Sequence, residues 1–202
     1  MATDSSKLPP DGGDSNGPIV EREPTFGAKV ALLDPNERRR KTVAEAITDR
    51  IDVQGFADPD TFEEEISGGV AVALFVASLP DERLLSLIRQ TLQESPHARI
   101  GLLDADGTEL LRTEVPCDEE LVLTERDELD RTVKRLYLRA YYAATLERLF
   151  KVTIVARDRR RQLDEETHGD DERLQRLGKT KSVLRSHLRL FRNVLGREDI
   201  RA

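Results

Sequence analysis

The chain has 202 residues, enough for one ordinary domain with an appendage or for two small domains, and a formal net charge of −7. Charged residues make up 35% of it and hydrophobic residues only 38%. Its longest apolar run, Gly68 to Ser78, is about half the roughly 20 residues that a membrane-spanning helix needs, and residues 1–30 contain no apolar signal-peptide core. These features exclude a membrane protein and predict a soluble protein of the cytoplasm.

Few residue types are available for metal or redox chemistry. Cys117 is the single cysteine, and the three histidines are scattered, so we expect no intramolecular disulfide, no metal site and no cofactor. Cys117 is interpreted as inert packing near the start of a strand, with a redox sensor as the alternative. The 7 lysines against 25 arginines indicate GC-rich codons or adaptation to molar salt, and we expect a salt-loving archaeon.

The charge is divided unevenly along the chain. Residues 1–125 hold 12 basic and 26 acidic side chains, whereas residues 126–202 hold 20 basic and 13 acidic ones. Such a division indicates either an acidic domain attached to a binder of nucleic acid or of an acidic partner, or two halves that attract one another.

Residues 1–26 are rich in Pro, Gly, Ser and Asp and are predicted to form a disordered acidic tail. Short apolar runs then alternate with amphipathic stretches up to residue 125. Strands are expected at 29–34, 53–56, 70–78, 98–104 and 119–123, and helices at 36–51, 60–66 and 80–95. The inward face of the third helix is predicted to hold Leu84, Leu85, Leu87, Ile88 and Leu92. This alternation predicts an α/β domain over 27–125 with a parallel sheet covered on both faces.

One segment of this domain has two interpretations. Residues 104–116 form either a shortened helix or a turn at Asp106 and Gly107 that leads into an extra strand, because Asp-Gly is a strong turn signal.

From Arg126 onward the hydrophobic period is helical. A stripe at alternating spacings of four and three predicts a helix of about 38 residues, ending near Leu163; its members are Leu129, Val133, Leu136, Ala140, Ala143, Glu147, Phe150 and Ile154. Gly169 suits the end of this helix, and Asp170 or Asp171 suits the N-cap of the next. The second stripe comprises Leu174, Leu177, Lys181, Leu184, Leu188, Phe191 and Leu195. Residues 126–202 are therefore predicted to form a helical hairpin or coiled coil.

These residues carry a resemblance to a known family. The alternation before Glu125 resembles the receiver domain of two-component response regulators, and RDELDRTVKRLYLRAYYAATLERLFKV, from Arg126, resembles the HalX domain that follows receivers in halophilic archaea. The resemblance covers about 27–195, and its most specific stretch is CDEELVLTERDELDRTVKRL. It implies a flavodoxin-like, five-stranded sheet followed by the hairpin.

The resemblance also implies a phosphoryl-transfer site. In receivers an aspartate ending the third strand attacks the phosphoryl group, acids after the first strand hold Mg²⁺, and a hydroxyl and a lysine after the fourth and fifth strands contact the phosphoryl oxygens. Here Asp34 matches one acid but is followed by Pro35, and the nucleophile position falls on Val76. The hydroxyl position falls on or beside Asp104, and the lysine position falls on Leu123.

No shift of the alignment restores the missing groups. No lysine lies between Lys41 and Lys134, and no acid lies between Glu65 and Asp81. The sequence therefore predicts a pseudo-receiver that is not an enzyme, binds no Mg²⁺ tightly and accepts no phosphate. Asp34 is either a vestigial metal ligand or the N-cap of the helix that follows it.

The C-terminal helices suggest contact surfaces. Glu147 and Lys181 interrupt the two stripes and either pair with each other or extend separately into solvent. Arg185, Arg189 and Arg192 form a positive stripe, expected to face a protein partner, nucleic acid or only solvent. We expect a signalling or regulatory protein that binds another signalling protein or a second copy of itself, with a DNA-binding transcription regulator as the alternative and no contact with a membrane.

Overall fold

The computed structural model describes residues 29–47, 51–66, 68–104, 115–123, 126–165 and 172–195. In chain order these contain β1 (Lys29–Leu33), α1 (Glu37–Ala46), β2 (Asp52–Phe56), α2 (Pro59–Glu65), β3 (Val70–Val76), α3 (Asp81–Glu94), β4 (Arg99–Asp104), β5 (Glu119–Val122), α4 (Arg126–Glu165) and α5 (Glu172–Val194). Each expected strand and helix is present, but the first helix ends at Ala46 and not at residue 51. The predicted tail, Gly169 and most of the ambiguous 104–116 segment lie outside the described residues.

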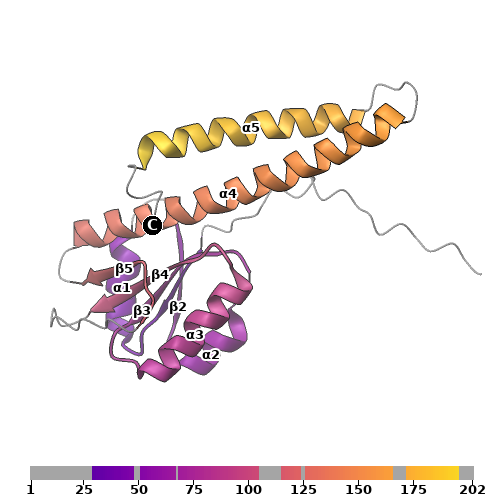
Figure 1. Ribbon diagram of the computed structural model, residues 1–202. Helices are drawn as coiled ribbons and strands as arrows, with labels where there is room; N and C mark the ends of the chain where they lie inside the picture. Colours follow the sequence, from indigo (N-terminus) through magenta and orange to yellow (C-terminus); the bar gives the residue numbers. More distant parts are fainter. Residues whose placement is uncertain are drawn as a thin grey trace, which may run out of the picture.

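The five strands form one parallel sheet in the order β2-β1-β3-β4-β5 (Figure 1). In the centre of the sheet, Leu32 pairs with Leu74, which in turn pairs with Gly101. This strand order is that of the flavodoxin-like doubly wound fold, so the predicted fold class is confirmed. In such a sheet the carboxyl ends of all strands meet at one edge. The direction in which successive strands are added to the sheet reverses between β1 and β3.

Two hydrophobic cores lie on opposite faces of the sheet, because successive side chains along a strand point to opposite sides. On one face Phe75 packs with Phe62 of α2 and with residues of α3 such as Leu87. On the other face Leu74 packs with residues of α1 and α4. All seven residues of β3 are buried, which explains why this strand is apolar along its whole length.

Side-chain caps begin the helices that follow β1 and β2. Asn36 caps α1 by accepting hydrogen bonds from the backbone N–H groups of Arg38 and Arg39. Asp58 caps α2 by accepting from the backbone N–H of Thr61 at 2.8 Å and from its hydroxyl at 2.8 Å, and these bonds lower the pKa of Asp58. Both caps satisfy amide groups that the first turn of a helix leaves without a partner.

The long helix α4 uses two of its faces. Its first half packs on the sheet through Leu129, Val133, Leu136 and Ala140, and then the helix continues past the α/β domain, where α5 lies antiparallel to it (Figure 1). The face that meets α5 is a different one: it carries Tyr141, which contacts Phe191, and Val152, which is buried with Leu177 and Leu184.

The expectation that one stripe of α4 serves the hairpin was therefore wrong. That stripe covers the sheet and then becomes exposed, with Phe150 at 66% and Ile154 at 43% exposure. The predicted stripe of α5 does face α4, as the burial of Leu177 and Leu184 shows. A boundary between residues 125 and 126 stays a prediction; α4 contributes to both parts. No helix among the described residues is long and apolar enough to cross a bilayer.

Two glycine substitutions test the packing. A Cβ at Gly101 would lie 2.7 Å from a methyl carbon of Leu121 and 2.7 Å from one of Leu74, both buried. We expect Gly101→Ala to lower the free energy of unfolding by about 1–3 kcal/mol, because the added methyl overpacks the core. Gly178→Ala is the matched control: nothing lies within 4 Å of the new methyl, and α5 should gain up to about 1 kcal/mol. Urea denaturation measures both values; a Gly101→Ala protein as stable as the wild type would contradict the packing described.

Candidate functional site

The positions of the predicted phosphoryl-transfer site lie at the carboxyl edge of the sheet. Leu33 pairs with Phe75 and Val76 with Leu103, so Asp34, directly after β1, lies beside the ends of β3 at Val76 and of β4 at Asp104. The backbone N–H of Leu123 donates to the carbonyl of Asp104 at 3.3 Å, which places Leu123 at the same edge. The four positions inferred from the sequence therefore lie at one edge of the sheet, the edge where open α/β sheets bind their ligands.

Asp34 is fully buried, and the residues that follow it surround its carboxylate. Arg39 donates from Nε to Oδ2 at 2.7 Å and from Nη2 to Oδ1 at 2.9 Å, which is a bidentate ion pair. The backbone N–H of Asn36 adds a third hydrogen bond to Oδ1 at 2.8 Å. Arg40 donates to the backbone carbonyl of Asp34 at 2.5 Å.

These contacts answer the question that the sequence left open for Asp34. The N-cap of α1 is Asn36, so the N-cap interpretation of Asp34 was wrong. Both carboxylate oxygens of Asp34 are instead engaged by Arg39, and a cation would have to displace a bidentate arginine to reach them. The run of three arginines at 38–40 was the available sequence signal, but it did not tell which arginine turns inward.

The nucleophile and lysine positions hold aliphatic side chains. Val76 is 1% exposed and belongs to the core beneath α2 and α3, while Leu123 packs against the core beneath α1 and α4. Neither side chain has a lone pair or a proton to offer to a phosphoryl group. In the described part of the chain no group of three His, Cys, Asp or Glu side chains is placed to hold a metal ion.

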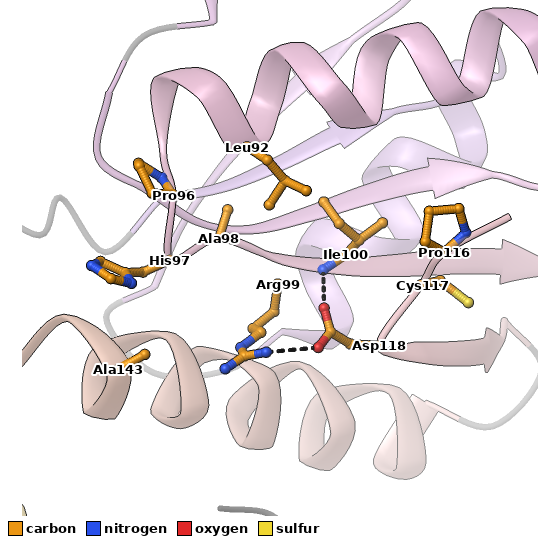
Figure 2. A pocket seen from close by; sticks show the side chains of 10 residues that line it. All are labelled: Leu92, Pro96, His97, Ala98, Arg99, Ile100, Pro116, Cys117, Asp118 and Ala143. Atoms are coloured by element: carbon orange, nitrogen blue, oxygen red, sulfur yellow. Dashed lines mark hydrogen bonds and ion pairs between the residues drawn. The ribbon is translucent and has the colours of Figure 1, made fainter. Parts of the chain in front are cut away.

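A pocket of about 310 Å³ lies at the opposite edge of the sheet, at the amino ends of β4 and β5 (Figure 2). Leu92, at 39% exposure, and Ala143 of α4 form apolar parts of its wall. The expectation that Leu92 faces the core was wrong, because this last turn of α3 lies at the rim of the pocket. Sequence reasoning did not find the pocket, since its walls come from segments far apart in the chain.

Asp118 is the centre of the polar contacts in this pocket. The carboxylate of Asp118 accepts from the backbone N–H of Ile100 at 2.8 Å and from Arg99 at 3.0 Å (Figure 2). The buried Arg139 of α4 lies 3.4 Å from the same carboxylate. These contacts make the pocket a junction between β4, β5 and α4. Burial, followed by nearby acids, raises the pKa of Cys117, which agrees with inert packing and not with a reactive thiolate.

Glu147 joins α4 to the α/β domain. Its carboxylate is hydrogen-bonded to Nε2 of His97, in the turn before β4, and lies 2.7 Å from the ammonium of Lys151. Lys151, followed by His97, lowers the pKa of Glu147. Among the described residues no ion pair joins Glu147 to Lys181, so the paired interpretation of these two residues was wrong.

The predicted positive stripe is present on α5. Arg185, Arg189 and Arg192 are exposed, and no ion pair with another described residue is found for any of them. They lie on the flank of α5, beside the face that packs on α4. Their spacing of four and three residues aligns the guanidinium groups along one side of the helix.

A flavodoxin-like domain whose last helix extends into a hairpin is the class of protein that these observations define. No protein-family model and no curated protein matches the chain. Among solved structures, the adenylate cyclase of Rhodopirellula baltica has a TM-score of 0.52 at 11% identity, covering 61% of this chain and 97% of its own.

Receiver domains are also among the similar structures. The receiver domain of the Francisella response regulator 1452 has a TM-score of 0.45 at 20% identity, covering 55% of this chain and 97% of its own. A CheY-like receiver domain of Methanospirillum hungatei has a TM-score of 0.42 at 16% identity, covering 55% and 94%. At these identities the likeness concerns the fold alone.

Removing Arg39 should destabilise the protein, because the buried carboxylate of Asp34 would lose its charged partner. We expect Arg39→Ala to lower the free energy of unfolding by about 1–3 kcal/mol, because Asp34 keeps its burial and loses its two charged hydrogen bonds. Arg38→Ala, one residue earlier on the exposed side of α1, should change it by less than about 0.5 kcal/mol. Chemical denaturation of both variants measures these changes. Equal stabilities of the two variants would contradict the stabilising role of the Arg39–Asp34 ion pair.

The contact of Glu147 should depend on pH. Because the pKa of Glu147 is lowered in the folded protein, the contact stabilises near neutral pH, and its contribution is lost as the pH falls through that value. We expect Glu147→Gln to lower Tm at pH 7, which corresponds to a loss of no more than about 1 kcal/mol in the free energy of unfolding. Well below about pH 4 the Tm of the variant should equal that of the wild type. Thermal melts across pH measure this, with Lys181→Met, expected to be silent, as the control.

Proposed function

We propose that this chain is a non-catalytic signalling or regulatory protein built on a pseudo-receiver: its α/β domain is not phosphorylated, and it acts through protein contacts of that domain and of the hairpin. The receiver-like fold supports the signalling role. The observation that carries the finer proposal is the bidentate pair of Arg39 with the buried Asp34.

Phosphoryl transfer needs a nucleophilic oxygen and a concentration of positive charge around the phosphoryl oxygens. At this edge Val76 replaces the nucleophile and Leu123 replaces the lysine. The Arg39 guanidinium supplies in permanent form the charge that a divalent cation would otherwise bring to Asp34. Because that charge is covalently part of the chain, it does not come and go as a bound cation does.

The output of such a domain is carried by rigid contacts. The 40 residues of α4 span about 60 Å, from the carboxyl edge of the sheet past its amino edge to the end of the hairpin. Asp118, Arg139 and the pair of Glu147 with His97 fasten this helix to the domain along the way. A partner bound to the domain and a partner bound to the hairpin are therefore held at a set distance and orientation.

Residues 27–125 serve as the receiver-like part and 126–202 as a HalX-like part, and the arginine-rich composition supports a haloarchaeal origin.

A transcription regulator that binds DNA through α5 is the second candidate. The exposed Arg185, Arg189 and Arg192 favour it, since arginines aligned on a helix suit contact with phosphates. Each phosphate contact lowers log affinity by about 0.9 per decade of salt, so three arginines alone bind weakly in concentrated salt.

Incubation of the full chain with acetyl phosphate and Mg²⁺, followed by intact-mass spectrometry, tests the pseudo-receiver. We expect no covalent adduct, because no carboxylate occupies the nucleophile position and the one at Asp34 is held by Arg39. The Asp34→Asn variant serves as the matched control. A phosphoryl adduct on the wild type that is absent from Asp34→Asn would overturn the proposal, as would an adduct anywhere on β3 or the loop after it.

The DNA-binding alternative is tested by gel shift with genomic fragments over a series of salt concentrations. Specific binding that is lost in Arg185→Ala with Arg189→Ala would favour the second candidate. Unchanged mobility of the DNA at low salt would exclude it.

A further inference from the structure

The hairpin presents a cationic side that carries exposed apolar residues. α5 holds seven lysines and arginines against one acid, Glu172. The arginines Arg185, Arg189 and Arg192 lie on one side of the hairpin. The two helices run antiparallel, with Tyr141 of α4 beside Phe191 of α5. From this register, the helical period of α4 places Leu146 on the same side as the arginines. Leu146 is 47% exposed, and Phe150, one turn further along α4, is 66% exposed. We call Leu146, Phe150, Arg185, Arg189 and Arg192 the basic flank.

The α/β domain presents a surface of the opposite charge. Arg83 of α3 forms ion pairs with Asp60 and Glu63 and thereby holds α2 beside the first turn of α3. Around this contact lie six exposed acids, which we call the acidic face: Asp58, Asp60, Glu64, Glu65, Asp81 and Glu82. Over α2, α3 and the cap of α2, eight acids face only two arginines, Arg83 and Arg89.

Within one chain these two surfaces are kept apart. The helices of the acidic face pack on the side of the sheet that contains Phe62 and Phe75, whereas α4 packs on the other side, against Leu74 (Figure 1). The sheet therefore lies between them. Two hairpins are also poor partners for each other, because both would bring an excess of positive charge to the contact.

We propose that the basic flank docks onto the acidic face of a second copy of this chain. Phe150 and Leu146 provide the apolar anchor, and the arginines form a rim that matches the acids of the partner in charge; aromatic and arginine side chains of this kind concentrate the binding energy of interfaces. A two-fold arrangement closes the contact into a dimer with two equal interfaces, and any other rotation continues it head to tail. This inference concerns surfaces remote from Asp34 and goes beyond the pseudo-receiver function.

Sedimentation velocity of the full chain tests the contact through charge reversal. The first variant carries Arg185→Glu and Arg189→Glu, and the second carries Glu64→Lys and Glu82→Lys. We expect each variant alone to associate roughly tenfold more weakly than the wild type or worse, since like charges now face each other. An equimolar mixture of the two variants should regain the association, because the reversed flank of one matches the reversed face of the other.

Two further measurements complete the test. Phe150→Ala should weaken association in low and in high salt, because the contribution of this side chain is apolar. Association of the wild type should weaken as salt rises, because the Debye length falls from about 10 Å at 0.1 M to about 3 Å at 1 M. Arg38→Glu with Lys41→Glu changes the net charge as much as the first variant but on α1, and it should associate like the wild type.

Several outcomes would overturn the proposal. These are a wild type that stays monomeric at every concentration and salt, a first variant that associates normally, and two variants that do not complement each other in the mixture. Loss of DNA binding without any change in self-association would assign the arginines to nucleic acid instead. Circular dichroism melts of each variant establish that it is folded. No phosphodonor enters these measurements, so their failure leaves the pseudo-receiver proposal standing.

Discussion

A carboxylate that water cannot reach has to be neutralised by the protein itself, and in this chain that requirement organises the carboxyl edge of the sheet. Asp34 follows β1 with no exposed surface, and Arg39 from the first turn of α1 donates hydrogen bonds to both of its oxygens. The pair sets the direction in which α1 leaves the strand and occupies the oxygens that a cation would use. At the same edge Val76, at the end of β3, and Leu123, just after β5, bring only aliphatic side chains.

The second organising feature is α4, which packs with two faces at once. Leu129, Val133 and Leu136 close the core of the sheet, and Val152 closes the small core of the hairpin on another face of the same helix. A helix used in this way transmits position well, because bending it would break packing at both ends. The exposed Phe150 lies where the first of these faces runs past the edge of the domain.

The uneven charge of the chain follows the same division of space. The acids gather on α2 and the start of α3, and the arginines gather on the hairpin, on the far side of the sheet. The sequence left open whether the two halves attract each other or serve an outside partner. The layered fold separates the acids of α2 and α3 from the arginines of α5. Electrostatic attraction can therefore join these two surfaces more readily when they belong to different molecules than when they belong to one.

The sequence by itself determined the order of strands and helices, the parallel sheet, the length of α4 and the aliphatic residues at two positions of the predicted phosphoryl-transfer site, because hydrophobic period and residue type are local properties. Only the tertiary structure decided which arginine neutralises Asp34, which face of α4 meets α5, and that Glu147 pairs with His97 and not with Lys181. A stripe of apolar residues shows that a surface is covered but not by what, since the covering residues come from elsewhere in the chain. The same reason hid the pocket beside Asp118 and the exposure of Leu92 and Phe150.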